Sequence, residues 1–343
     1  YTLCAAVGGL KSEDWTPVNQ RGNVRIRTLP FSDDWLARLW HRLRLPIPVE
    51  AITGSLDLFY SPDFALPPTL GAAKRLLTVH DLSFVHHPDA FVPRLQRYLQ
   101  SVVPRSIDQA DLVLADSAHT RNDLITLFDV TPGEVTVIYP GVDARFQPEP
   151  EPGERRRLHD RYDIGDRPYV LSVGTLQPRK NYGHLIQGFI GFQATIAPEM
   201  ELLIAGGRGW LYEDIVREAE THDGVRLLGF VEDEDLPALY RGAELFALTS
   251  LYEGFGLPVL EAMACGTPAV CSNTSSLPEV AGDAAMLVDP RDPAELTEAF
   301  MQVSEDENLR EKMIRRGLTQ AASFTWERSA RDLLDVIDSF KEA

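Results

Sequence analysis

Apolar residues recur along the chain in short runs that predict a regular alternation of strands and helices. Strands are indicated at 1–7, 24–29, 56–60, 75–79, 112–115 and 135–139, and then at 169–173, 201–205, 225–231, 245–249, 269–272 and 286–288. Segments with helical periodicity or helix-capping residues separate most of them, including 94–110, 117–128, 181–196, 211–221, 233–242 and 293–303. This alternation predicts an α/β fold with two doubly wound, parallel, Rossmann-like sheets.

A stretch without a strand pattern divides the chain near its middle. Residues 146–166 contain the sequence PEPEPG and many charged residues, which is typical of a boundary between domains. We therefore expect an N-terminal domain over 1–150 and a C-terminal domain over 151–325. The last residues, 326–343, are expected to form a separate helix.

Two segments of the N-terminal half stand out, one as a helix and one as a loop. The stretch 35–43 is expected to be an amphipathic helix with Trp35 and Trp40 on its apolar side, and 83–93 lacks periodicity and is expected to be a recognition loop. His80 follows the strand 75–79, where ligands bind in open α/β sheets, and the neighbouring Asp81 is expected to orient its ring. The alternative is that His80 is a satisfied polar residue at a strand end.

The composition limits the class of protein and of partner. The chain has 343 residues, of which 44% are hydrophobic, and this suffices for two domains with cores of their own. With 51 acidic and 33 basic residues the net charge is −18, which disfavours nucleic acid as a partner because such binding needs a basic face. No apolar run is long enough for a transmembrane span. Cys4, Cys265 and Cys271 are too few for a disulfide framework and lack zinc-site spacing, so we expect a cytoplasmic protein.

The most informative stretch is 250–270, SLYEGFGLPVLEAMACGTPAV. Its pattern predicts a strand, a glycine-rich turn, a helix and a strand, with Pro258 at the first helical position and Gly266 just past the helix end. Glu253 would then lie in the turn and Glu261 in the first helical turn, beside amides that favour an anion. Carboxylates accept hydrogen bonds from sugar diols, so the stretch suits a sugar nucleotide. The alternative is two surface glutamates beside an ordinary turn.

A second turn supplies the positive charge that this stretch lacks. Gly174 follows the strand 169–173, and Arg179 and Lys180 stand just before the helix 181–196. Arg binds phosphate oxygens bidentately and Lys adds a compact charge, so the pair is suited to neutralise a diphosphate without a metal ion. The alternative is a solvated basic turn in which Asn181 caps the helix.

Other nucleotide-binding and catalytic signatures are missing from the sequence. It contains no GxGxxG signature, no Walker A sequence and no GxSxG elbow, which disfavours a nicotinamide dehydrogenase and a Ser-His-Asp hydrolase. The end of the strand 225–231 offers the backbone groups of Phe230 and Val231 to a base, although an ordinary strand end is the favoured interpretation unless the rest of the site is accepted.

Together these motifs resemble one family. SVGTLQPRKN (172–181), LLGFV (227–231), EGFGLPVLE (253–261) and AMACGTPAV (262–270) look like the motifs of the retaining glycosyltransferases of family 4, which have the GT-B fold. VHDLSF (79–84), ADSAHTRNDL (115–124) and VIYPGVDARF (137–146) resemble N-terminal motifs of the same family. The resemblance covers nearly the whole chain. It implies two Rossmann-like domains that face each other across a cleft, and a C-terminal helix, 326–343, that crosses back onto the N-terminal domain.

The resemblance also implies roles for individual residues. Arg179 and Lys180 would bind the donor diphosphate, Glu261 the ribose hydroxyls, and His80 would lie at the catalytic centre near the donor sugar. The backbone near the end of the strand 225–231 would hold the base, and Glu253 would contact the transferred sugar and phosphate. The remaining donor-binding residues are Gly174, Phe230, Val231, Gly254, Phe255, Gly256 and Leu257. Because 1–7 resembles the second strand of the family, its first βα unit is expected to lie outside this sequence.

The activity implied by the resemblance is that of a metal-independent, retaining hexosyltransferase without a cofactor. GDP-mannose is favoured as the donor and UDP-glucose is next, and the acceptor is a saccharide or a lipid-linked glycan in glycan or polysaccharide synthesis. Alternatives on the same fold are a nucleotide-sugar epimerase, a sugar phosphorylase and a non-catalytic sugar-nucleotide-binding subunit. A lipid-linked acceptor is compatible with a cytoplasmic protein that makes peripheral contact with the inner face of the membrane.

Overall fold

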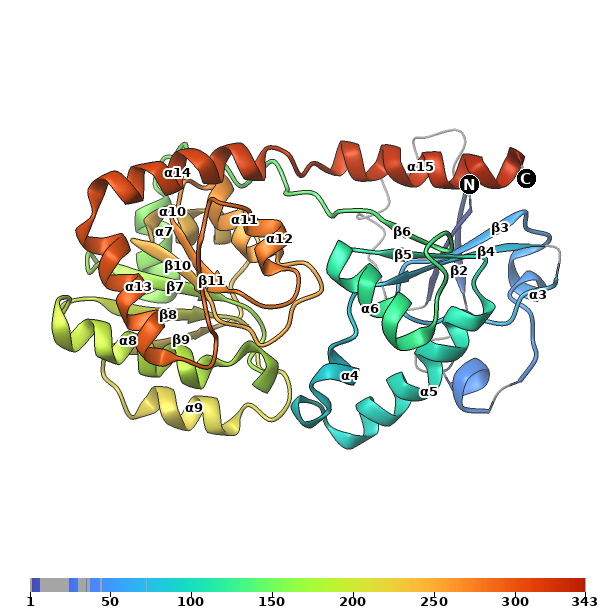
Figure 1. Cartoon of the computed structure of the whole chain (residues 1–343), viewed down its shortest axis with the longest axis horizontal. Helices are drawn as coiled ribbons and strands as arrows, with labels where there is room; N and C mark the ends of the chain where they lie inside the picture. The colour runs from blue at the N-terminus through green and yellow to red at the C-terminus, as the bar shows by residue number, and fades with distance from the viewer. Residues whose placement is uncertain are drawn as a thin grey trace. The chain divides into compact units, whose positions relative to one another are not determined.

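The computed structural model describes residues 2–6, 25–29, 35, 38–43, 45–71 and 73–342 (Figure 1). Its contacts divide the chain into two units. Unit 1 comprises Tyr1–Val79, Ser101–Leu114 and Val130–Val135, and unit 2 comprises His80–Gln100, Ala115–Asp129 and Thr136–Ala343. Unit 2 thus joins the second half of the chain to two segments of the first half. The expected domain limits at 150 and 325 stay a prediction.

Unit 1 is built around short strands. β1 (Thr2–Ala6) pairs in parallel with β2 (Arg25–Leu29), and a separate sheet has the order β3-β4-β5-β6. The strands of that sheet are β3 (Leu58–Ser61), β4 (Lys74–Val79), β5 (Leu112–Ala115) and β6 (Val135–Val137). The apolar run of β4 explains its place within this sheet, since Leu76, Leu77 and Val79 are fully buried. α3 (Glu50–Thr53) lies in unit 1, and α5 (Pro93–Gln109) begins in unit 2 and ends in unit 1.

Unit 2 is organised around a six-stranded sheet with the order β12-β11-β10-β7-β8-β9 and parallel pairing throughout. β7 and β10 are neighbours at its centre, and the chain runs outward from β7 in one direction and from β10 in the other. In such sheets ligands bind outside the carboxyl ends of the strands at the point of reversal. The strands are β7 (Tyr169–Val173), β8 (Glu201–Ala205), β9 (Val225–Gly229), β10 (Leu245–Leu248), β11 (Ala269–Ser272) and β12 (Met286–Val288).

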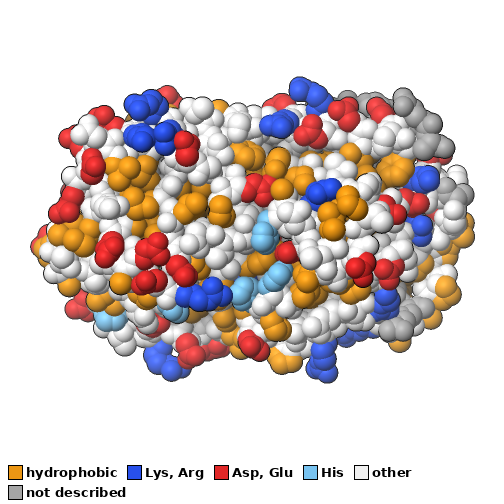
Figure 2. Space-filling model, in the orientation of Figure 1, with side chains coloured by type: hydrophobic (Ala, Val, Ile, Leu, Met, Phe, Trp, Pro, Cys, Tyr) orange, Lys and Arg blue, Asp and Glu red, His pale blue; other side chains and the backbone are white. Residues whose placement is uncertain are grey.

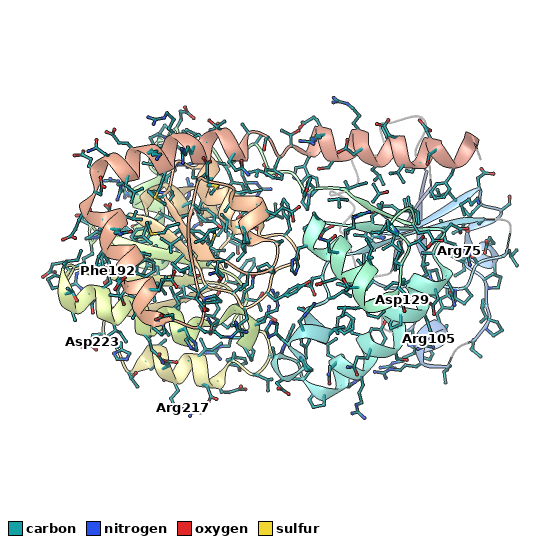
Figure 3. The ribbon with its side chains drawn as sticks, viewed as in Figure 1. Arg75, Arg105, Asp129, Phe192, Arg217 and Asp223 are labelled. Atoms are coloured by element: carbon teal, nitrogen blue, oxygen red, sulfur yellow. The ribbon has the colours of Figure 1, made fainter. Side chains whose placement is uncertain are left out.

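Helices cover both faces of this sheet (Figure 1). One face packs against α8 (Tyr182–Thr195), α9 (Glu213–Glu220) and α13 (Pro293–Glu305), and the other against α7 (Glu154–Tyr162), α10 (Leu236–Gly242), α11 (Leu257–Ala264) and α12 (Leu277–Ala281). Phe192, labelled in Figure 3, lies with Phe189 and Phe300 in the hydrophobic core between the sheet and α8, α9 and α13. The other helices of unit 2 are α4 (Ser83–His86), α6 (Ala118–Phe128), α14 (Glu307–Ala321) and α15 (Trp326–Glu342). Acidic side chains are spread over the face shown in Figure 2, as the net charge leads one to expect.

Most predicted elements are confirmed where the structure describes them. β5, β7, β8, β11 and β12 have the predicted bounds, because each is a short and mostly apolar run within its sheet. Ser117 caps α6 as expected, since its side chain accepts a hydrogen bond from Thr120 N at 3.0 Å. The break predicted at residues 8 and 9 lies outside the described residues.

Three segments differ from the prediction. Where a regular amphipathic helix is expected at 35–43, the structure has a π-helix, Arg38–Arg42, in which Leu43 N donates to Arg38 O. Trp35 and Leu43 are exposed, so these two apolar side chains are not packed into a core. The expected loop 83–93 contains α4 and the 3-10 turn Pro88–Ala90, since Phe84 and Phe91 are buried and pin it down. The segment 146–166 lacks a strand as predicted but contains α7.

Candidate active site

Arg179, Lys180 and Glu253 form one buried ionic group in unit 2. Lys180 Nζ lies 2.6 Å from Glu253 Oε1, and Arg179 Nη1 lies 2.9 Å from Glu253 Oε2. The two basic residues follow β7 and the glutamate follows β10, so the pairing of these central strands brings the three side chains together. Ser250 Oγ also donates to Glu253 Oε1 at 2.5 Å. The predicted convergence of the basic turn and the glutamate turn is therefore observed.

The electrostatics of this group are dominated by burial and by the two cations. Only 10% of the Glu253 side chain is exposed, with 11% for Arg179 and 10% for Lys180. Burial by itself raises the pKa of Glu253, but the charges of Lys180 and Arg179 outweigh it and lower this pKa from 4.5 to about 2. The pKa of Arg179 is raised although burial opposes its charge, because Glu253 lies against it. Glu253 is thus ionised at neutral pH.

The glycine-rich turn before α11 has the predicted form with two differences. Gly256 is the residue before the helix and has φ +116°, so Leu257 begins the helix and Pro258 is its second residue rather than its first. Glu261 consequently lies in the second turn of α11, not the first. Gly266 follows the helix end with φ +76°, as predicted.

Gly254 marks a close approach between this turn and His80. A Cβ atom at Gly254 would lie 2.1 Å from the backbone oxygen of His80, so only glycine fits. The ring of His80 is fixed by Asp116, whose Oδ2 lies 2.8 Å from Nδ1. The partner of Nδ1 is thus Asp116, where Asp81 is the expected one. Asp81 Oδ1 instead accepts from Ser83 N at 2.8 Å, because the chain turns into α4 there.

Glu261 lies in a group of its own. Its Oε2 accepts a hydrogen bond from the Tyr240 hydroxyl at 2.7 Å. Burial raises the pKa of Glu261, while the Tyr240 hydrogen bond and the charge of Arg145 oppose that shift. A carboxylate held in this way has acceptor capacity for a further hydroxyl pair.

The other predicted donor-binding residues border the carboxyl ends of the strands. The Gly174 carbonyl accepts from Tyr182 Oη at 2.7 Å, and a Cβ there would lie 3.2 Å from Lys180 Cε, so glycine lets the lysine cross the strand end. Phe255 is buried, Phe230 is 68% exposed and Val231 is buried.

Several residues of the site carried no recognisable signal in the sequence. In the alternative interpretation Asn181 caps α8 beside a solvated basic turn, but its side-chain amide donates to Thr249 O at 3.0 Å and to Pro290 O at 2.7 Å, which links the loops after β10 and β12. Asp116 and Tyr240 were missed because their partners lie far away in the sequence. Ser250 could have been identified from the sequence, because it lies only three residues before Glu253.

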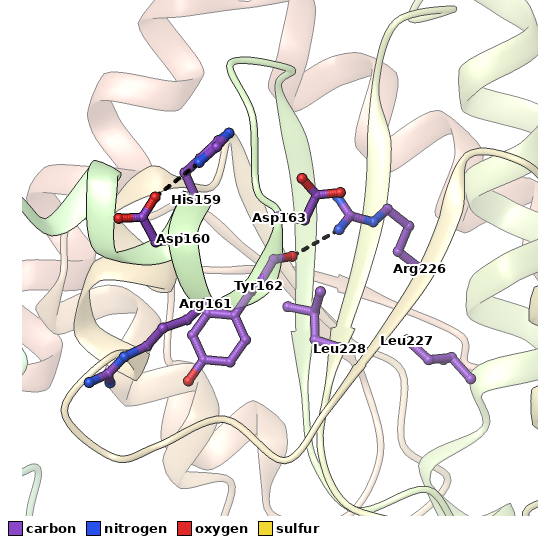
Figure 4. Close-up of a pocket in the computed structure, with 8 residues that line it drawn as sticks. All are labelled: His159, Asp160, Arg161, Tyr162, Asp163, Arg226, Leu227 and Leu228. Carbon is purple, nitrogen blue, oxygen red and sulfur yellow. Dashed lines mark hydrogen bonds and ion pairs between the residues drawn. The ribbon is translucent and has the colours of Figure 1, made fainter.

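A pocket of about 580 Å³ lies beside α7 and β9 (Figure 4), and none of the predicted site residues lines it. Its Arg226 is already paired, with Tyr162 O at 2.9 Å and with Glu201 Oε2 at 3.3 Å. Among the residues that the structure describes, no group of three His, Cys, Asp or Glu side chains is arranged to hold a metal ion. Within the same residues, no helix has the length and apolarity needed to cross a membrane.

The fold and the ionic group together define a class of protein. Two parallel α/β sheets, with a basic turn and a glutamate turn at the carboxyl ends of adjacent strands, are those of a GT-B glycosyltransferase. The model of the family described as glycosyl transferases group 1 matches residues 154–320, and that of glycosyltransferase family 4 matches residues 3–146. The chain therefore belongs to the glycosyltransferases of group 1 and family 4.

Known relatives agree with this assignment. The chain is 38% identical over 275 residues to O-antigen chain mannosyltransferase B of Escherichia coli, covering 79% of this chain and 71% of that protein. It is 35% identical over 251 residues to D-inositol 3-phosphate glycosyltransferase of Salinispora tropica, covering 67% of this chain and 51% of that protein. The chain thus spans about half the length of the second relative. The crystal structure of HepE of Anabaena in complex with UDP and glucose superposes with a TM-score of 0.72 at 22% identity, over 92% of this chain and 86% of that one, and shows the same fold.

Proposed function

We propose that this glycosyltransferase moves a hexose from a nucleotide-diphosphate sugar to a saccharide or lipid-linked acceptor in glycan or polysaccharide synthesis, with retention of configuration and without a metal ion. The observation that carries the proposal is the convergence of Arg179 and Lys180 on Glu253 at the carboxyl ends of two adjacent central strands. The mannosyltransferase relative supports GDP-mannose as the donor, with UDP-glucose next.

The donor diphosphate would be bound by charge and by backbone amides. Arg179 offers a planar fork and Lys180 a compact charge, and the start of α11 adds the positive end of a helix dipole. Negative charge grows on the diphosphate as its bond to the sugar breaks, so these groups stabilise the transition state more than the bound donor. Glu253 keeps both cations in place and contacts the transferred sugar. Glu261 takes the ribose hydroxyls.

The base and the sugar complete the donor site. The backbone at Phe230 and Val231 would hold the base, and Gly174 would leave room for the phosphates beside the lysine. His80 is the proposed catalytic residue on the sugar side: Asp116 holds its Nδ1, which directs the rest of the ring away from that carboxylate. The acceptor oxygen bonds to the anomeric carbon on the face that the diphosphate leaves, and its proton passes to the departing phosphate oxygen.

A lipid-linked acceptor agrees with a surface feature of unit 1. The stretch 35–48 contains no Asp or Glu in a chain whose net charge is −18. Trp35, Leu43 and Ile47 are 54%, 64% and 42% exposed, and Arg38 and Arg42 are exposed among them. Apolar and cationic side chains in one stretch favour an anionic lipid surface. We therefore propose that a cytoplasmic form of this protein makes peripheral contact with the inner face of the membrane through this stretch. Sedimentation with phosphatidylglycerol vesicles but not with phosphatidylcholine vesicles is the expected result.

The catalytic proposal is tested by incubating the protein with GDP-mannose or UDP-glucose and a panel of saccharide acceptors. We expect release of the nucleoside diphosphate and an acceptor-linked sugar whose anomeric configuration, measured by NMR, matches that of the donor. Lys180→Ala should abolish transfer, whereas removal of the exposed Lys312 on α14 should not. An epimer formed from the donor alone, or a donor that binds without turnover on any acceptor, would refute the assignment.

A further inference from the structure

The residue immediately before Glu253 is held by groups that the proposed transfer does not use. Only 3% of Tyr252 is exposed, and its hydroxyl donates to Asp123 Oδ2 at 2.6 Å. Asp123 lies on α6 and is 9% exposed. A hydrogen bond from a buried phenol to a carboxylate is charge-assisted and directional, so it fixes the orientation of the tyrosine ring.

Histidines surround the same ring. His86 stacks on Tyr252 with ring centroids 5.1 Å apart and planes at 22°, and His119 and His87 meet it edge-on at 5.5 and 6.3 Å. His86 Nε2 lies 2.9 Å and His119 Nε2 3.6 Å from the Asp123 oxygen that accepts from the tyrosine. Histidine side chains gather on the face shown in Figure 2. We call Tyr252, Asp123, His86 and His119 the tyrosine anchor.

The backbone of Tyr252 is part of the donor turn. Its carbonyl oxygen accepts from Arg179 Nη1, and Leu251 N donates to Arg179 O at 2.9 Å. The next residue, Glu253, binds both Arg179 and Lys180. A movement of the tyrosine ring would therefore displace the backbone of Tyr252, and with it the adjacent Glu253 carboxylate and the Arg179 guanidinium that donates to the Tyr252 carbonyl.

We propose that Tyr252 is a positioning residue, and that the tyrosine anchor fixes the turn 250–254 so that Glu253 and Arg179 keep the geometry that a donor diphosphate needs. The expected effect on turnover rests on the proposed function, whereas the effect on the turn does not. A displacement of about 1 Å in a positioned group costs on the order of 100-fold in rate. If Tyr252 were only a core residue, removing its hydroxyl would have the same effect on turnover as removing the hydroxyl of any other buried tyrosine.

Hydrogen exchange of the full chain tests the anchor without a donor. Tyr252→Phe keeps the stacked ring and removes the hydroxyl. The matched control is Tyr169→Phe, at the start of β7: Tyr169 is 4% exposed, and its hydroxyl donates to Leu239 O at 2.8 Å. We expect amide exchange over 250–256 to accelerate by about tenfold or more in Tyr252→Phe and to stay unchanged in the control.

Turnover and rescue test the consequence for catalysis. With the GDP- or UDP-sugar that the wild type uses, Tyr252→Phe should lower kcat of nucleoside diphosphate release by about ten- to hundredfold and change KM less. Asp123→Asn keeps an acceptor oxygen and should stay within about threefold of the wild type, whereas Asp123→Ala should fall as far as Tyr252→Phe. Because both remove the same interaction, the double variant should be no worse than Asp123→Ala alone.

Each outcome decides the matter. Unchanged exchange over 250–256 in Tyr252→Phe, or equal losses of kcat in Tyr252→Phe and Tyr169→Phe, would overturn the proposal. If Tyr252→Phe does not fold, His86→Phe replaces it in both measurements, because it keeps the stack and loses the Nε2 contact with Asp123. If the wild type releases nucleoside diphosphate from no donor, the proposed function fails and hydrogen exchange still decides whether the anchor holds the turn.

Discussion

Replacing Glu253 by glutamine tests how the buried cations are held. Glu253→Gln keeps the size and the hydrogen-bonding capacity of the side chain and removes its charge. Arg179 and Lys180 would then lie together with about a tenth of each side chain exposed and no carboxylate between them. Breaking a buried ion pair by removing one partner leaves an uncompensated charge, which is strongly destabilising.

The size of the effect follows from the ionisation of the carboxyl group. The pKa of Glu253 falls from 4.5 to about 2 in the folded protein, a shift of about 2.5 units. At about 1.4 kcal/mol per unit, ionisation stabilises the folded state by about 3 kcal/mol at neutral pH. Glutamine represents the neutral acid, so the free energy of unfolding should fall by about 3 kcal/mol.

Urea unfolding at pH 7, followed by circular dichroism, measures this loss. Glu234→Gln is the control, because Glu234 also pairs with an arginine, Arg161, but its side chain is 65% exposed. The urea midpoint of this variant should equal that of the wild type within error. Since the folded pKa is depressed, the stabilisation is complete above about pH 4.5 and is lost as the pH falls through about 2. The difference between the wild type and Glu253→Gln should therefore narrow over that interval. Equal midpoints at pH 7 would refute the charge argument.

Three further outcomes follow from the site and its surroundings. Lys180→Ala should weaken calorimetric binding of GDP or UDP by about 10- to 100-fold, and equal affinity would show that the lysine does not contact the diphosphate. Gly254→Ala would place Cβ 2.1 Å from a backbone oxygen and should cost more than about 1 kcal/mol in urea unfolding, whereas Gly207→Ala, with nothing within 4 Å, should cost little. Burial raises the pKa values of Cys265 and Cys271 to about 12, so iodoacetamide should label them only after unfolding, which peptide mass spectrometry would verify.

Local sequence patterns were sufficient for most of the fold of unit 2. Its strands are continuous apolar runs, such as Leu202, Leu203 and Ile204 in β8, which are fully buried, and glycine or proline stands near many of their ends. The same patterns failed at 35–43, where apolar residues recur at helical spacing but the structure has the π-helix Arg38–Arg42, and Trp35 and Leu43 are exposed. Periodicity predicts a helix only where a core is available to cover its apolar side.

The candidate site could be predicted as far as its motifs reach. The sequence identifies Arg179, Lys180 and Glu253 as candidates, because these charged residues stand in turns that contain glycine or proline and follow predicted strands. Their partners do not follow from local pattern, because the pairing of His80 with Asp116 depends on which strands and helices are neighbours. Tyr252 was within the motif, yet its role became visible only through Asp123 on a distant helix.

The adjacency of β7 and β10 also determines when the site forms during folding. Lys180 and Glu253 are separated by 73 positions, and β8, β9 and their helices lie between them in the chain. Closing a loop of that length costs conformational entropy, and the chain loses this entropy before the contact between Lys180 and Glu253 contributes any stabilisation. A nascent chain that has emerged only as far as β9 carries the basic turn without its counter-charge. We therefore expect the ionic group to be a late contact that forms when the two halves of the sheet join.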